Sequence, residues 1–176
     1  MTESRRPTET RGKINALSAV LSTAACALLV FLPWSLPVPL TPSYWNAVAV
    51  FALTAILCDS WLFTSAFANL SGSIVFVPLF ATVLLFGHPV PMVIASLTAW
   101  VVETLVMHKP AHRVWFNVAQ FSVAIGLASV VYSALGGHVG LNDFSFKLVP
   151  FAGLVVTYFL VNQGSVALAV ALSSGI

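Results

Sequence analysis

The chain has 176 residues, of which 59% are hydrophobic and only 7% are charged. Soluble domains carry about 25% charged residues, so this composition excludes a water-soluble globule and indicates a chain that folds in a bilayer. The net charge of +2 is too small to indicate nucleic-acid binding, and the basic residues are therefore interpreted by their positions.

The first 13 residues are polar and basic, and we expect them to form a cytoplasmic N-terminal tail. The apolar run that follows is too long for the core of a signal peptide and has no clear small-residue cleavage site. It is therefore predicted to be a retained first span. Residues 14–176 are expected to form a single transmembrane helical domain.

Six apolar segments approach the roughly 20 residues that a helix needs to cross a bilayer. The sequence thus predicts an all-α, polytopic membrane bundle of about six transmembrane helices. The predicted spans are residues 14–34, 44–66, 71–87, 89–107, 113–135 and 148–172. Pro78 falls inside the third of these spans and is expected to kink it or to mark a packed irregularity.

The basic residues are distributed unequally between the two sides of such a bundle. With six spans both termini share a side, and six basic residues lie there against Lys147 alone on the other. The positive-inside rule then places both termini and the loop "HKPAHR" in the cytoplasm. We interpret the six as an anchor at the lipid headgroups, with a contact to a cytoplasmic partner as the alternative. They are Arg5, Arg6, Arg11, Lys13, Lys109 and Arg113.

Several polar side chains fall within the predicted spans. A carboxylate at the centre of a membrane helix costs about 2.5–3.5 kcal/mol on insertion scales, so Asp59 and Glu103 should face protein or water. Asn117 and Gln120 are three residues apart and share a helix face, and one of them is predicted to hydrogen-bond an acid. The possible intramembrane cluster comprises Asp59, Glu103, Asn117, Gln120, Asn162 and Gln163.

Three roles are open for this cluster: polar contacts between helices, a pocket for a ligand or ion, or a proton relay. The stretch "VNQGS" also interrupts the last span near its middle. This interruption could serve as a hinge that carries a change to the cytoplasm. Alternatively, Gly164 and the nearby alanines let this span pack tightly against its neighbours.

Motifs for catalysis and for metal binding are absent from the sequence. It has no phosphate-binding glycine loop, no Cys-x-x-Cys pair and no zinc-protease motif. Cys26 and Cys58 lie in apolar runs, and the histidines are expected as interfacial polar residues in loops or at span ends. We therefore expect no enzyme activity, no catalytic residue, no metal site and no cofactor. The histidines are His88, His108, His112 and His138.

The stretch "HKPAHRVWFNVAQFSVAIGLASVVYSALGG" and the later "YFLVNQGSVALAVALSSGI" carry a resemblance. Residues 105–176 resemble the N-terminal multi-span membrane region of bacterial signalling proteins with HD, HD-GYP or GGDEF output domains. The resemblance implies a location in the bacterial cytoplasmic (inner) membrane and a cytoplasmic output domain as partner. No output domain is present in this sequence, so the chain is either a fragment or a free-standing relative.

The leading hypothesis is a non-enzymatic integral membrane module that acts as a sensory input or interaction domain. The first alternative is an accessory structural subunit of a larger membrane complex, with other membrane proteins as partners. The second is a solute-capture subunit with a small-molecule ligand. That alternative rests on the similarity of the six-span plan to the S-components of energy-coupling-factor transporters.

Overall fold

The computed structural model describes residues 6–32, 41–60, 63–64, 71–140 and 147–174, with side chains from residue 12 onward except at 63–64 and 71–72. These residues form six α-helices, in agreement with the predicted helical class. The helices are α1 (Arg6–Phe31), α2 (Pro42–Ser60), α3 (Phe76–Phe86), α4 (Val90–Val101), α5 (Ala111–Ala134) and α6 (Leu148–Ser174). A π-helix, η1 (Val102–Val106), continues α4.

A very short antiparallel ladder joins α2 to α3, where the sequence predicted only a helix and a turn. It pairs β1 (Phe63–Thr64) with β2 (Ser71–Gly72). The second span was predicted to reach residue 66, but α2 ends at Ser60. Apolar residues continue in the sequence beyond Asp59, so hydropathy alone does not show that the helix ends at Ser60.

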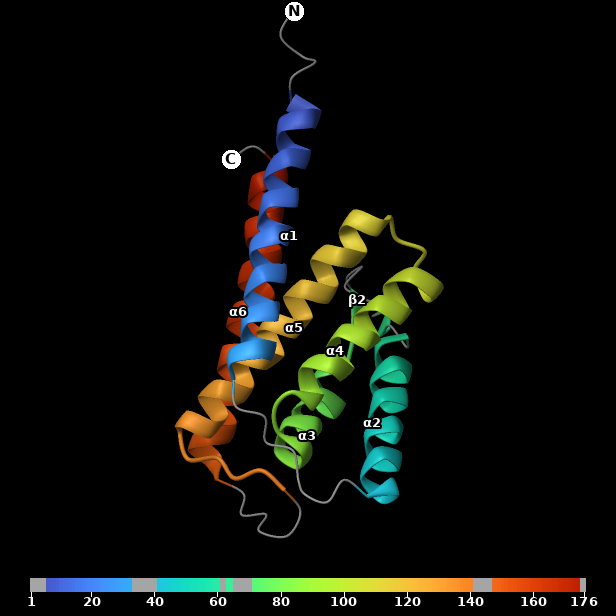
Figure 1. Cartoon of the computed structure of the whole chain (residues 1–176). Helices are drawn as coiled ribbons and strands as arrows, with labels where there is room; N and C mark the ends of the chain where they lie inside the picture. The colour runs from blue at the N-terminus through green and yellow to red at the C-terminus, as the bar shows by residue number, and fades with distance from the viewer. Residues whose placement is uncertain (1–5, 33–40, 61–62, 65–70, 141–146, 175–176) are drawn as a thin grey trace, which may run out of the picture.

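Successive helices run in opposite directions, as Figure 1 shows. The start of α1 and the end of α6 therefore lie at the same end of the bundle, and the connection between η1 and α5 faces that end as well. This arrangement agrees with an even number of passes.

Three helical segments in the described part of the chain are long and apolar enough to cross a membrane: residues 12–31, Ala111–Ala134 and Leu148–Ser174. The other helices are shorter or more polar. At 1.5 Å per residue the 11-residue α3 is only about 16 Å long, half the thickness of the hydrocarbon core. The structure thus supports a helical membrane bundle, and six complete passes stay a proposal.

Pro78 and Pro7 each lie in the first turn of a helix. Pro78 was expected to kink a span that starts at residue 71, but α3 starts at Phe76. Pro78 is therefore the third residue of α3, in the first turn, where its missing N–H removes no helical bond. At the chain start, Pro7 is the second residue of α1, a position that also favours proline. The first helix consequently includes most of the predicted tail, because helical bonding continues beyond the apolar run.

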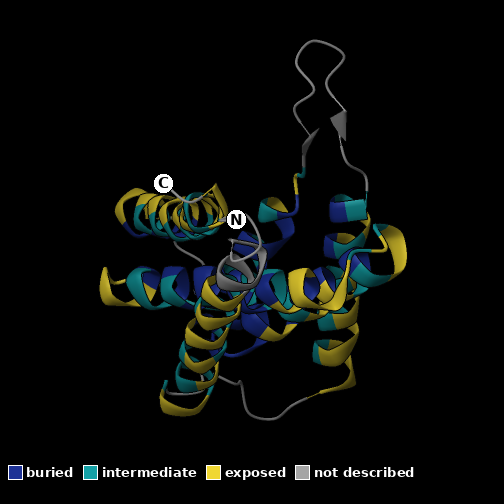
Figure 2. Ribbon diagram, turned by 90° about the horizontal axis from the view of Figure 1, so that it is seen from above, coloured by how far each residue is buried: buried dark blue, intermediate teal, exposed yellow. Residues whose placement is uncertain are grey.

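The core lies where α2, α3, α4 and α5 meet, and it continues onto one face of α6. Leu79, Met92, Ile125 and Leu154 are fully buried there, and the ring of Tyr158 packs edge-on against Phe80. A smaller cluster joins α1 to α5. Viewed from the end of the bundle, the outer faces of α6 are exposed (Figure 2). These faces are apolar, with Val156, Leu160, Leu168 and Val170 among the exposed residues, as expected of a helix that faces lipid.

Cysteine labelling should test the orientation of the bundle. Ala111 begins α5 at the end where the termini lie, and His138 follows α5 at the opposite end; both are exposed. In a chain with Cys26 and Cys58 replaced by alanine, we expect an impermeant maleimide to label a His138→Cys variant from outside intact cells. Ala111→Cys should react only after the membrane is opened, and labelling of both from outside would contradict the predicted orientation.

Candidate functional site

The six predicted cluster residues lie in several places of the bundle. Asp59 and Glu103 are both buried, at 7% and 8% exposure. Gln120 is buried as well and contacts Asn162 of α6. Within the described residues, no hydrogen bond joins Asn117 or Gln120 to either acid. Glu103 pairs with Lys109 instead, and Gln120 pairs with Asn162.

The partner of Glu103 is Lys109, which the sequence had assigned to the solvated anchor. Lys109 Nζ lies 2.7 Å from Glu103 Oε1, and the Lys109 backbone N–H donates to the Glu103 carbonyl oxygen at 2.9 Å. The other carboxylate oxygen, Oε2, is buried without a hydrogen-bond partner in the described structure. A lysine that the sequence placed in a solvated loop is thereby turned back to pair with a buried acid.

The local backbone explains this reversal. Met107 N–H donates to the Val102 carbonyl oxygen, which is the wider turn of a π-helix. His108 then adopts a left-handed conformation with φ of 52°, and Pro110 disfavours helical geometry in the residue before it. Helix η1 therefore ends, and Lys109 is brought back over Glu103 before α5 begins.

Asp59 belongs to the same end of the bundle. The Ser73 hydroxyl group hydrogen-bonds the Asp59 side chain and also approaches the Cys58 carbonyl oxygen at 3.4 Å. Asp59 lies within electrostatic reach of both Glu103 and Lys109. Two buried carboxyl groups and one ammonium group are thus neighbours, an arrangement that offers acceptor oxygens to the donor group of a ligand.

A second polar contact joins α5 to α6. Gln120 Nε2 donates to the Asn162 side-chain oxygen at 2.7 Å and to the Asn162 carbonyl oxygen at 3.0 Å. These residues are 42 positions apart in sequence, and both lie near the middle of their helices. Because hydrogen bonds to neutral amides in an apolar medium resist separation, this pair fixes the register of α6 on α5.

The other two predicted amides do not join either group. Gln163 is exposed on the outer face of α6, next to Val156 and Leu160. Asn117 lines a cavity between α1, α5 and α6. Among the anchor residues, Arg113 is exposed beside this cavity, and Lys13 is exposed on α1. Arg5 lies outside the described residues, and only the backbone is described for Arg6 and Arg11.

Gly164 differs from its expected role. A side chain added at this position would meet nothing within 4 Å, so this glycine does not bring α6 close to a neighbour. Close approaches occur at other glycines: at Gly153 of α6, where a Cβ atom would meet the Leu135 side chain, and at Gly126 of α5. A Cβ atom at Gly126 would lie 2.8 Å from Met92 Sδ and 3.1 Å from Leu28 Cδ1.

His88 is buried, although the sequence indicated an interfacial residue. It lies between α3 and α4 at 6% exposure, near the backbone of Leu28 and Leu29 on α1. Burial lowers the pKa of His88 below the usual histidine value, and the nearby backbone of α1 opposes the shift. Both ring nitrogens are buried without a hydrogen-bond partner in the described structure. The prolines in "GHPVP" indicate a turn, but a turn signal does not predict that the histidine side chain within it is buried.

A model of the MASE9 family, a family of membrane-associated sensory domains, matches residues 43–176. The match covers about three quarters of the chain, and it includes both polar contacts described above. No curated protein and no solved structure is significantly similar to this chain.

Proposed function

The chain belongs to the MASE9 family of membrane-associated sensory domains, and from this premise we propose that it is a non-enzymatic, multi-pass input module of the bacterial inner membrane. In this proposal α6 carries a change in the packing of the bundle to the cytoplasm. An HD, HD-GYP or GGDEF output domain, as the resemblance of residues 105–176 implies, would receive the change.

The observation that carries this proposal is the contact of Gln120 with Asn162. This contact is a hydrogen bond between a side chain of α5 and a side chain of α6 in the described structure. Any sliding or rotation of α6 must change this contact, whereas the apolar surfaces around it can slide with smaller changes in energy. In the proposed mechanism the pair holds α6 in one register, and loss of the pair marks the second packing state that a transmitting element requires.

The course of α6 supports the same role. The helix has 27 residues, about 40 Å at 1.5 Å per residue, and it ends at the same end of the bundle as the start of α1. Most of its length is exposed, with Leu154 and Tyr158 as its fully buried large side chains in the first half. The second half packs through Val161, Ala169 and the Asn162 contact, and its residues are not among the buried residues of α6. In this proposal it tilts without opening the core.

The two alternatives from the sequence are kept as proposals, and each predicts a different binding surface. An accessory subunit would cover the exposed apolar face of α6 with another protein. A solute-capture subunit would bind a small molecule at the end of the bundle opposite the termini. The family match favours the sensory input module over both.

The proposed coupling can be measured with spin labels at the ends of α5 and α6. Ala111 and Ser174 are exposed, and cysteines there, in the chain without Cys26 and Cys58, report the distance between the two helices in lipid nanodiscs. We expect Gln120→Leu and Asn162→Leu each to shift or broaden the distance distribution, because loss of the pair releases α6. Double electron–electron resonance provides the measurement.

Gln163→Leu is the matched control. It removes a side-chain amide one residue from Asn162, on the exposed face of α6, and should leave the distribution unchanged. If Asn162→Leu gave the same distribution as the parent chain, or if Gln163→Leu changed it equally, α6 would not be held by this pair and the proposed transmission route would fail.

A further inference from the structure

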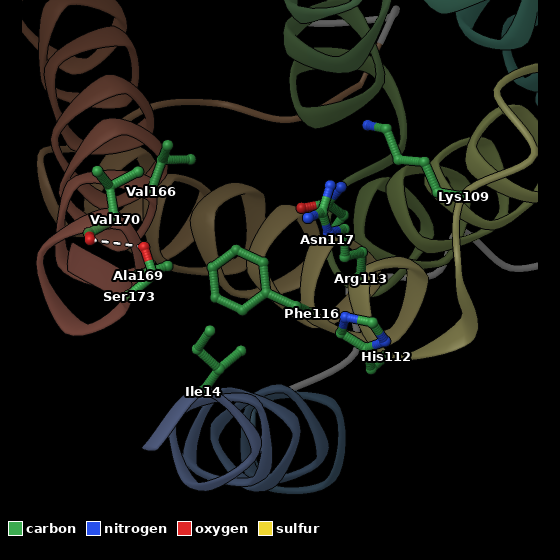
Figure 3. A pocket seen from close by; sticks show the side chains of 10 residues that line it. All are labelled: Ile14, Lys109, His112, Arg113, Phe116, Asn117, Val166, Ala169, Val170 and Ser173. Carbon is green, nitrogen blue, oxygen red and sulfur yellow. Dashed lines mark hydrogen bonds between the residues drawn. The ribbon is translucent and has the colours of Figure 1, made fainter. Parts of the chain in front are cut away.

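A cavity opens between α1, α5 and α6, at the end of the bundle where the termini lie (Figure 3). Its volume is about 350 Å³, within the range of roughly 300–1,000 Å³ that is usual for small-molecule sites. Its lining residues are Ile14, Lys109, His112, Arg113, Phe116, Asn117, Val166, Ala169, Val170 and Ser173.

The lining has two chemically different parts. Lys109, His112 and Arg113, from the start of α5 and the loop before it, supply cationic and N–H donor groups. Phe116 projects from α5 into the space between α1 and α6, where Ile14 and Val166 face it (Figure 3). No acidic residue lines the cavity in the described structure. Lys109 is paired with Glu103, which lies outside the lining, so Arg113 is the lining cation without an acidic neighbour in the cavity.

We propose that this cavity binds the headgroup and first acyl carbons of an anionic phospholipid. The guanidinium group of Arg113 matches the geometry of a phosphate group, and the His112 ring supplies a further donor. The acyl carbons lie against Phe116 and Val166. This lipid site goes beyond the proposed sensory role, because lipid binding at the site does not depend on movement of α6.

A bilayer lipid fits the cavity better than free phosphate does. Half of the lining is apolar, and the cavity is bounded by Val166 and Val170, which are exposed on the lipid-facing side of α6. A soluble anion would leave this apolar wall in water. An acyl chain covers it and continues along the exposed face of α6.

Lys109 connects this cavity to the buried acid. Its side chain lines the cavity, while its ammonium group is bonded to Glu103 Oε1 at 2.7 Å. An anionic headgroup would compete with Glu103 for that ammonium group. Removal of the Glu103 charge should therefore free Lys109 for the lipid and strengthen binding.

Native mass spectrometry of the purified chain in detergent, with added lipid, tests the site. Dioleoylphosphatidylglycerol should bind more tightly than dioleoylphosphatidylcholine. Arg113→Gln should weaken binding of the anionic lipid about fivefold, the factor that corresponds to ~1 kcal/mol per basic residue at an anionic surface. Lys147→Gln removes the same charge at the opposite end of the bundle and should have no effect.

Two further variants make the test specific to this cavity. Ala169→Phe should reduce binding of the anionic lipid without any change in charge, because the ring fills the cavity. Glu103→Gln should increase binding severalfold. Unchanged elution on size exclusion and an unchanged helical circular dichroism spectrum will show that each variant is folded.

Equal binding of the two lipids, or equal effects of Arg113→Gln and Lys147→Gln, would overturn the proposal. Displacement of the lipid by inorganic phosphate at the same concentration would overturn the assignment to a lipid. A lack of any increase in Glu103→Gln would overturn the competition for Lys109. None of these binding results depends on movement of α6, so the site and the proposed sensory function can fail separately.

Discussion

Replacement of Lys109 by methionine should lower the free energy of unfolding by about 2–3 kcal/mol. The substitution keeps most of the side-chain volume but leaves the Glu103 side chain, which is 10% exposed, without its cation. Removal of one partner from a buried ion pair typically costs about 3–5 kcal/mol. The Lys109 side chain is 34% exposed, so we expect an effect somewhat below that range. Unfolding in mixed micelles with increasing SDS, followed by circular dichroism, provides the measurement.

A double-mutant cycle separates the ion pair from other effects of the substitution. Glu103→Gln alone should destabilise by only about 1 kcal/mol or less, because the partly exposed ammonium group can turn to water. Lys109→Met combined with Glu103→Gln should recover most of the stability lost in Lys109→Met. Lys147→Met controls for the loss of a lysine at an exposed position. Additive effects of the two single changes would show that the Glu103–Lys109 contact contributes nothing to stability.

The helical class and the approximate places of the six helices could be predicted from the sequence because each contains an apolar run, although α3 has only 11 residues and α2 ends before its predicted end. The pairing of Lys109 with Glu103 could not. Hydropathy placed Lys109 in a loop and Glu103 in a span, and the contact depends on a π-turn and on the left-handed backbone of His108. Neither feature has a periodicity that a sequence pattern reports, so a basic loop residue was interpreted as solvated.

The polar contact between α5 and α6 was predicted only in its parts. The sequence placed Gln120 and Asn162 within spans, where an amide requires a partner. The choice of partner depends on which faces of α5 and α6 pack together. In a bilayer the lipid-facing surface is as apolar as the packed surface, so the usual helical alternation of polar and apolar residues does not mark the buried face. For the same reason Gln163 was grouped with Asn162, although it is exposed.

Small residues present the same difficulty, and two glycines show it. Gly126 and Gly164 both lie within apolar helices, and the sequence treats them alike. In the structure Gly126 is buried against Met92 and Leu28, while nothing lies within 4 Å of a Cβ atom at Gly164. The chain thus uses one glycine for close packing of α5 against α4 and α1, and leaves the other on an exposed helix face.

Gly126→Leu should therefore destabilise the bundle by about 3 kcal/mol, the upper end of the usual range for an overpacked core. The new Cβ atom would lie 2.8 Å from Met92 Sδ and 3.1 Å from Leu28 Cδ1, and Met92 is fully buried. Because a methionine side chain is flexible, it can yield to one extra carbon atom but not to a whole isobutyl group. Gly126→Ala should consequently cost much less than Gly126→Leu in the same SDS titration.

Gly164→Leu is the control, because it makes the same chemical change at an open position. Both substitutions gain the same helix propensity, about 0.8 kcal/mol relative to glycine, so the difference between them reports packing alone. At Gly164 the leucine side chain enters open space on α6, and stability should be unchanged or slightly higher. Equal losses at the two positions would show that α5 does not approach α4 and α1 as closely as the structure indicates, since of these two glycines Gly126 is the one whose added Cβ atom meets another helix.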